Sequence, residues 1–111
     1  MKLLITGMNG LLGNVLVRKL IENHQVFALV KKSKNKIVHK NLEIIKTDLA
    51  SFNEKKLPKK IDFIIHLAQS NFYNNFPEKG KDIFDVNISA TFNLLNFAYK
   101  NKIKNFLYTS T

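Results

Sequence analysis

The sequence contains no cysteine and no long apolar run, and it has few acidic residues. The absence of cysteine excludes a disulfide framework, thiol catalysis and cysteine-ligated metal sites, and it fits a reducing cytoplasm. We expect no metal site. No apolar run approaches the roughly 18 residues that suggest a membrane span, so no membrane association of that kind is expected. The amino-terminal segment MKLLITGMNG is interrupted by Thr6 and Gly7 too early for a secretory signal, and it is typical of a first strand.

Basic residues outnumber acidic ones by 18 to 8, which gives a formal charge of +10. Such a charge favours polyanions, either nucleic acid or phosphorylated ligands. The excess is nearly all lysine, it is spread along the chain and it accompanies abundant asparagine, so a solvated lysine surface is the alternative. The most basic segment, KKSKNKIVHK, carries no nucleic-acid motif beyond its charge. Nucleic acid is therefore not the partner that we expect.

The 111 residues, 45% of them hydrophobic and 23% charged, have the size and composition of one globular domain. Apolar β-rich runs predict five strands, and helical spacing of apolar residues predicts two helices with a shorter one between them. The expected strands are residues 2–6, 25–30, 42–46, 61–67 and 105–108, and the expected helices are 11–23, 79–100 and a short one within 51–57. This alternation predicts an α/β fold with a doubly wound parallel sheet in the order 3-2-1-4-5. Ligands then bind at the carboxyl ends of the strands, near the switch between strands 1 and 4.

The long expected helix, residues 79–100, has two apolar faces. The first holds Ile83, Val86, Asn87, Ala90, Leu94 and Leu95, and the second holds Phe84, Ile88, Phe92 and Tyr99. We expect the first face to pack on the sheet and the second to be exposed, which suggests a subunit interface. The alternative is that both faces serve one small core.

A glycine-rich turn, TGMNGLLG, joins the first expected strand to the first helix and places glycines at 7, 10 and 13. The first glycine permits a tight turn, the second lets the backbone approach a pyrophosphate, and the third lets the helix pack on the strand. The helix N-terminus offers free N–H groups and a partial positive charge to phosphates. Because the motif follows a strand and opens an amphipathic helix, it predicts dinucleotide binding. A glycine-rich turn without a ligand is the alternative.

The spacing Gly-x-x-Gly-x-x-Gly after Thr6 resembles that of the short-chain dehydrogenase/reductase superfamily, especially its extended branch, the NAD-dependent epimerase/dehydratase family. Four more segments are similar to this family, in the same order. They are TDL, HLAQS, DVNISATFNLL, in which Ala90 replaces the family's glycine, and KNFLYTST. The five landmarks extend over the whole chain. The resemblance implies a Rossmann-type fold over residues 1–111, a nicotinamide dinucleotide as cofactor, and hydride transfer on a nucleoside-diphosphate sugar.

The resemblance also implies roles for individual residues. The Asp48 carboxylate would accept from the adenine amino group with Leu49 packing at the ring, and Thr111 would bind the substrate as a catalytic residue. The implied cofactor contacts are Gly7, Asn9, Gly10, Leu11, Leu12, Gly13, Asp48, Leu49, Leu67, Ala68, Gln69, Asn87 and Thr109. Simpler roles stay open: Asp48 as a helix N-cap, His66 as a hydrogen-bonded strand-end histidine, and Asn87 as a polar residue bonding a neighbouring strand.

The end of the second expected strand bears on the choice between NAD and NADP. NAD-binding members of the family carry an acidic residue there, which accepts from the ribose hydroxyls. This sequence has Lys31 and Lys32 instead, which would pair with a 2′-phosphate. The two lysines therefore favour NADP, with solvated lysines of a biased composition as the alternative.

The family's catalytic Tyr-x-x-x-Lys pair is not in this sequence. Tyr73 is followed at that distance by Pro77 and Tyr99 by Ile103, and Tyr108 lies too near the end. We therefore expect a cofactor half whose Tyr-Lys helix and substrate domain would follow residue 111, inactive alone, marginally stable and self-associating. In the family, helix 79–100 pairs with the missing helix in the bundle of a homodimer. A non-catalytic module that binds or senses NAD(P)(H) is the alternative function.

Overall fold

The computed structural model describes residues 1–32, 37–69 and 74–109. Its centre is a five-stranded parallel sheet in the order β3-β2-β1-β4-β5, so the predicted fold class and strand order are confirmed. The strands are β1 (Lys2–Thr6), β2 (Gln25–Val30), β3 (Leu42–Lys46), β4 (Phe63–His66) and β5 (Asn105–Tyr108). In the middle of the sheet, Ile5 of β1 is paired with Ala28 of β2 and Ile65 of β4.

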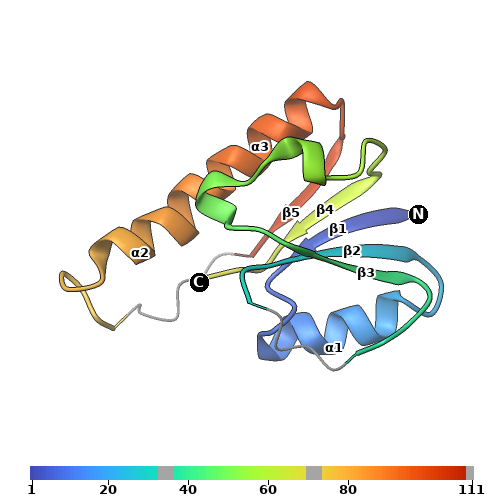
Figure 1. Ribbon diagram of the computed structural model, residues 1–111, viewed down its shortest axis with the longest axis horizontal. Helices are drawn as coiled ribbons and strands as arrows, with labels where there is room; N and C mark the ends of the chain where they lie inside the picture. The colour runs from blue at the N-terminus through green and yellow to red at the C-terminus, as the bar shows by residue number, and fades with distance from the viewer. Residues whose placement is uncertain (33–36, 70–73, 110–111) are drawn as a thin grey trace.

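Helices cover both faces of the sheet, as Figure 1 shows. Helix α1 (Leu11–Leu20) lies on one face, and the rod of α2 (Gly80–Phe84), η3 (Asp85–Ser89) and α3 (Ala90–Lys100) lies on the other. Successive strand residues point to opposite faces. In β1, Leu3 and Ile5 accordingly join the core under α1, whereas Leu4 joins the core under α3. Burial on both faces explains why β1 is apolar without alternation.

The structure shortens three of the predicted elements. The helix predicted at 11–23 ends at Leu20, and the next residues form tighter turns, in which the Asn23 N–H donates to the Leu20 carbonyl at 3.2 Å. The short helix predicted within 51–57 is replaced by two 3₁₀ turns, η1 (Leu49–Ser51) and η2 (Glu54–Lys56). Each begins at a side-chain cap, Asp48 or Asn53, and ends where the backbone becomes extended, at Phe52 or Leu57, so no longer helix forms. The strand predicted at 61–67 is regular only over β4, although the Asp62 and Leu67 N–H groups on either side also donate to carbonyls of β1.

The helix predicted at 79–100 is interrupted by the π-helical turn η3. Within α3 the buried residues are Ala90, Leu94, Phe97 and Ala98. This spacing follows a 3.6-residue period, and Leu95, which lies about 100° around the helix from Leu94, is exposed rather than buried as predicted. The second face is exposed, as expected: Phe84, Ile88, Phe92 and Tyr99 are all at least half accessible. The alternative, in which both faces serve one core, is therefore wrong. None of the helices in the described ranges has the length and apolarity to cross a membrane.

Candidate functional site

The glycine turn lies where the carboxyl ends of β1 and β4 meet. Gly7 has a φ of +83°, and a Cβ built there would lie 2.7 Å from both the Ala68 nitrogen and the Leu67 carbonyl carbon. Only glycine fits this conformation and this close approach. At Gly13 a Cβ would lie 1.9 Å from the Gly7 oxygen, so the third glycine lets α1 pack directly on the turn. Both positions agree with the packing roles expected of the motif.

Gly10 differs from the other two glycines because it is not required by packing. A Cβ there would meet just one described atom within 4 Å, the Gly7 oxygen at 3.4 Å. The space beside Gly10 is otherwise open in the described part of the chain. An open approach to the backbone is what a ligand at this turn needs.

The N-terminus of α1 beside Gly10 presents unused donors. The first intrahelical bond runs from the Asn14 N–H to the Gly10 oxygen at 2.9 Å. Among the described residues, no atom accepts from the backbone N–H of Leu11, Leu12 or Gly13, and the first turn holds no acidic side chain. Three aligned N–H groups and the helix dipole make this end of α1 suited to an anion.

A buried polar cluster joins β1 to β4 directly beneath this turn. The Thr6 hydroxyl lies 2.6 Å from Nδ1 of His66 and accepts from the N–H groups of Leu67 and Ala68, both at 3.1 Å. Thr6 and His66 are completely buried. Because the two N–H groups are engaged by Thr6, Leu67 and Ala68 can meet a cofactor only through their side chains and carbonyl groups.

The other ring nitrogen of His66 reaches the helical layer. Nε2 of His66 lies 2.9 Å from Oγ1 of Thr91, and this hydroxyl donates to the Asn87 carbonyl at 3.1 Å. The Tyr108 ring stacks on the imidazole. Burial away from water lowers the pKa of His66 from its ordinary 6.5 to about 4, so the imidazole is neutral at pH 7. The simpler role considered for His66, a hydrogen-bonded strand-end histidine, is what the structure shows.

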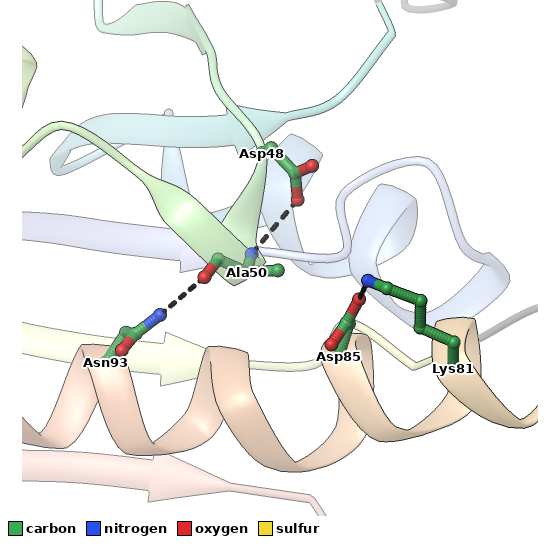
Figure 2. A network of polar contacts seen from close by, with 5 residues as sticks. All are labelled: Asp48, Ala50, Lys81, Asp85 and Asn93. Carbon is green, nitrogen blue, oxygen red and sulfur yellow. Dashed lines mark hydrogen bonds and ion pairs between the residues drawn. The ribbon is translucent and has the colours of Figure 1, made fainter.

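Asp48 lies at the end of β3, where it caps η1. One of its carboxylate oxygens accepts from the Ala50 N–H at 3.0 Å, and Nδ2 of Asn93 in α3 donates to the Ala50 oxygen at 2.9 Å (Figure 2). The simpler role for Asp48 is thus also observed, and its carboxylate remains exposed. Nearby on α2, the hydrogen bond and charge of Asp85 raise the pKa of Lys81 (Figure 2).

The segment after β2 is tied to the glycine turn by Asn9. Its Nδ2 donates to the Lys32 oxygen at 3.3 Å, so this side chain positions the backbone that carries the two lysines. Lys31 and Lys32 are both exposed. The Lys32 backbone therefore lies beside the glycine turn, and the two lysine side chains are open to solvent.

Thr109 follows β5 and Gln69 comes after β4, both beyond the carboxyl ends of these strands. The Thr109 N–H donates to the His66 oxygen at 3.3 Å, which extends the pairing of β4 with β5. Gln69 is exposed, whereas Leu49 and Asn87 are half-buried. Thr111 lies outside the described residues.

Sequence reasoning missed Thr6, Thr91 and Tyr108. A signal for the first two was present: Thr6 directly precedes the first glycine, and Thr91 follows Asn87 by four residues, one helical turn. Within the described ranges, no group of three or more His, Asp or Glu side chains is arranged to hold a metal ion.

A parallel sheet in this order, with a glycine turn opening a helix at its switch point, defines a Rossmann-type dinucleotide-binding fold. The chain belongs to the NAD dependent epimerase/dehydratase family, whose model matches residues 3–111. Comparison with curated proteins finds no match to this chain.

Solved structures of sugar-nucleotide enzymes share the fold. UDP-N-acetylglucosamine 4-epimerase from Methanobrevibacter ruminantium, in complex with UDP-N-acetylmuramic acid, is 28% identical with a TM-score of 0.87 over 99% of this chain. A UDP-glucuronic acid 4-epimerase variant from Bacillus cereus, with NAD and a UDP-sugar, is 23% identical with a TM-score of 0.85 over the whole chain. UDP-glucose 4-epimerase from Thermotoga maritima, with UDP-glucose, is 24% identical with a TM-score of 0.80, also over the whole chain. The chain spans 37%, 40% and 38% of these three proteins, respectively.

Proposed function

We propose that residues 1–111 are the dinucleotide-binding part of an NAD(P)-dependent nucleotide-sugar epimerase, dehydratase or reductase. The observation that carries this proposal is the α1 N-terminus, where three backbone N–H groups have no described acceptor beside the open face of Gly10. A pyrophosphate needs such a cradle, and the residues present fit it. When bound, the cofactor supplies hydride acceptance and donation. The chain's own residues bind and orient it.

The proposed cofactor contacts follow the edge of the sheet. The N–H groups of Leu11, Leu12 and Gly13 bind the pyrophosphate. The exposed carboxylate of Asp48 accepts from the adenine amino group, with Leu49 packing beside the ring. The other proposed contacts are Gly7, Asn9, Gly10, Leu67, Ala68, Gln69, Asn87 and Thr109. Asn9 contributes by placing the Lys32 backbone.

Gly10 offers a direct test of this site, because the fold does not need glycine there. A Gly10→Val side chain would fill the open space that the cofactor requires, so we expect the affinity for NADH and NADPH, measured by titration calorimetry, to fall at least about tenfold. Gly80→Ala, at the first residue of α2, is the matched control and should leave affinity unchanged. Equal affinity of wild type and Gly10→Val would contradict the proposed site.

We propose NADP as the preferred dinucleotide. The support is the exposed pair Lys31 and Lys32 at the end of β2 and the absence of an acidic residue there. We expect Lys31→Ala to weaken NADPH binding about tenfold, the size of one hydrogen bond to a charged group, without changing NADH binding. Lys104→Ala, at the opposite edge of the sheet, is the control lysine. If NADH and NADPH bind with equal affinity and Lys31→Ala changes neither, Lys31 and Lys32 are solvated surface lysines and the proposed preference for NADP is wrong.

The proposed substrate is a nucleoside-diphosphate sugar, in keeping with the family and with the 28%-identical epimerase. Thr111 is the proposed catalytic contact to a substrate hydroxyl or carbonyl. A general base is also needed for hydride transfer from a sugar carbon, and the 111 residues hold no Tyr-x-x-x-Lys. The second proposed function is a module that binds NAD(P)(H) without turnover. Reading the coding sequence beyond codon 111 separates the two: a continuing frame with a Tyr-x-x-x-Lys pair supports the enzyme, and a stop codon there supports the module.

We also propose that the chain forms a homodimer through the exposed face of α2, η3 and α3. The support is the set of accessible apolar side chains Phe84, Ile88, Phe92 and Tyr99 on this face, because gathered exposed apolar side chains mark interaction surfaces. We propose a cytoplasmic location for this cysteine-free chain.

A further inference from the structure

The hydrogen bonds around His66 form one directed chain across three elements. The Thr6 hydroxyl has one proton and two lone pairs, and the Leu67 and Ala68 N–H groups occupy both lone pairs. The Thr6 proton therefore points to Nδ1 of His66, which must be unprotonated.

The same reasoning fixes the direction of the hydrogen bonds at the Thr91 end of this network. The Asn87 carbonyl can only accept, so the Thr91 proton points to it. Thr91 must then accept from Nε2–H of His66. His66 is thus held as the neutral tautomer with its proton on Nε2, and every donor in this hydrogen-bond network has an acceptor. No buried side-chain nitrogen or oxygen among the described residues lacks a partner.

The two ends of this hydrogen-bond network are segments of the proposed cofactor site. At one end, the Leu67–Ala68 backbone passes through the space that a Gly7 side chain would occupy. At the other end, Asn87 lies in the π-helical turn η3, a departure from α-helix that is frequent at functional sites. Moving either segment would break a hydrogen bond of this buried network, which costs free energy because the groups are shielded from water.

We propose that Thr6, His66 and Thr91 are positioning residues that hold the Leu67–Ala68 backbone and the Asn87 turn in one fixed arrangement for ligand binding. The effect on ligand binding rests on the proposed dinucleotide function. The coupling between the Leu67–Ala68 backbone and the Asn87 turn does not depend on that function. The critical element is the His66 tautomer, because it determines how many donors converge on the Thr6 oxygen.

Thr91 is the most informative residue to change. In Thr91→Val the Nε2–H group loses its acceptor, which favours the opposite tautomer with the proton on Nδ1. That proton would compete with the Leu67 and Ala68 N–H groups for the two lone pairs of Thr6. Because the Leu67 N–H also donates to the Thr6 carbonyl at 3.2 Å, the expected consequence is the release of the Ala68 N–H, on a different element from the substitution.

Three measurements on the full chain test the proposal. Imidazole ¹⁵N NMR should place the His66 proton on Nε2 in the wild type. In Thr91→Val, amide hydrogen exchange at Ala68 should accelerate at least about tenfold, as for the loss of one hydrogen bond. Dinucleotide affinity should fall by a similar factor. Thr91→Ser, which keeps the hydroxyl, should restore both to within about threefold of wild type.

Ile61→Val is the control for general destabilisation, because Ile61 is a buried core residue near the amino end of β4, away from the site. A His66 proton on Nδ1 in the wild type would overturn the proposal. The proposal would also be overturned if amide exchange at Ala68 in Thr91→Val matched that in Ile61→Val once both rates are corrected for the unfolding free energy of each variant. If the wild type binds neither NADH nor NADPH, the proposed function fails, and the exchange and NMR results still decide the coupling.

Discussion

The Tyr108 ring lies almost flat on the His66 imidazole, with ring centroids 5.2 Å apart and planes inclined by 19°. The two residues are register partners on adjacent strands β4 and β5. Tyr108 is itself 43% exposed, whereas His66 is completely buried. The tyrosine therefore covers the imidazole on the β5 side of the sheet.

Removing this cover should change the titration of His66. In Tyr108→Ala, water reaches the imidazole and its pKa should rise from about 4 toward its ordinary 6.5, with a loss of roughly 1 kcal/mol of stability from the stacked pair. Tyr108→Phe keeps the ring and should preserve both properties. NMR titration of the His66 ring protons measures the pKa. An unchanged pKa in Tyr108→Ala would show that the sheet and α3 alone exclude water.

His66 should also make stability depend on pH. Its folded pKa of about 4 lies below the unfolded value near 6.5, so the unfolded chain binds more protons between these values. The stabilisation is fully present above pH 6.5 and is lost as the pH falls toward 4, by up to roughly 3 kcal/mol. The described partners of the ring, Thr6, Thr91 and Tyr108, carry no charge that would shift this window.

Urea unfolding across that pH window measures this dependence. His66→Gln is the reference, because it keeps the carboxylates that titrate at lower pH and removes the imidazole. The difference in unfolding free energy between wild type and variant should narrow as the pH falls. A difference that does not change with pH would mean that His66 has the same pKa in the folded and the unfolded chain.

The glycines of the turn should differ in their tolerance of substitution. Gly7→Ala places a Cβ at positive φ and 2.7 Å from the backbone of residues 67 and 68, so we expect a loss of at least about 2 kcal/mol. Gly10→Ala meets one atom at 3.4 Å and should cost less than about 1 kcal/mol. Urea midpoints with unchanged m-values measure both. Similar losses at the two positions would contradict the assigned packing roles.

The apolar face of α3 should control self-association. Phe92 is 67% exposed, so Phe92→Ser removes apolar surface without opening the core, and we expect weaker self-association with stability within about 0.5 kcal/mol of wild type. Sedimentation velocity over a range of concentrations measures the first, and urea unfolding the second. Asn96→Ser, exposed on the same helix, is the control. Unaltered association in Phe92→Ser would place the interface elsewhere.

The sequence was most informative where local pattern determines structure. The strands at Lys2–Thr6, Gln25–Val30, Leu42–Lys46 and Asn105–Tyr108 have the predicted bounds, because apolar runs end at glycine, charged or polar residues there. The glycine turn was equally predictable, since the positive φ of Gly7 and the packing of Gly13 on the Gly7 carbonyl are local, although the close approach of residues 67 and 68 to Gly7 is not. Asp48 shows the limit: its sequence position allowed both a cap and a cofactor contact, and the observed cap leaves its carboxylate exposed.

Three features of the site and of the helical layer were not predicted from the sequence. The bond between Thr6 and His66 joins residues 60 positions apart, and only the sheet register brings them together. The π-helical turn η3 has no recognisable signal in DVNIS, because it requires only a shift in backbone pairing. Leu95 was assigned to the buried face because it is apolar and adjacent to Leu94, whereas the sheet selects Phe97 and Ala98 instead.

The central place of β1 has a consequence for how the chain folds. Because β2 follows β1 closely in the sequence, we expect these two strands to pair early, whereas β4, on the other edge of β1, follows about 60 positions later. Until then an apolar strand has an unpaired edge, which is the kind of surface that other chains join. Loop closure over this distance makes the β1–β4 pairing the slow step that we expect to limit folding. Newly made chains are thus most prone to aggregate before residues 63–66 reach the sheet.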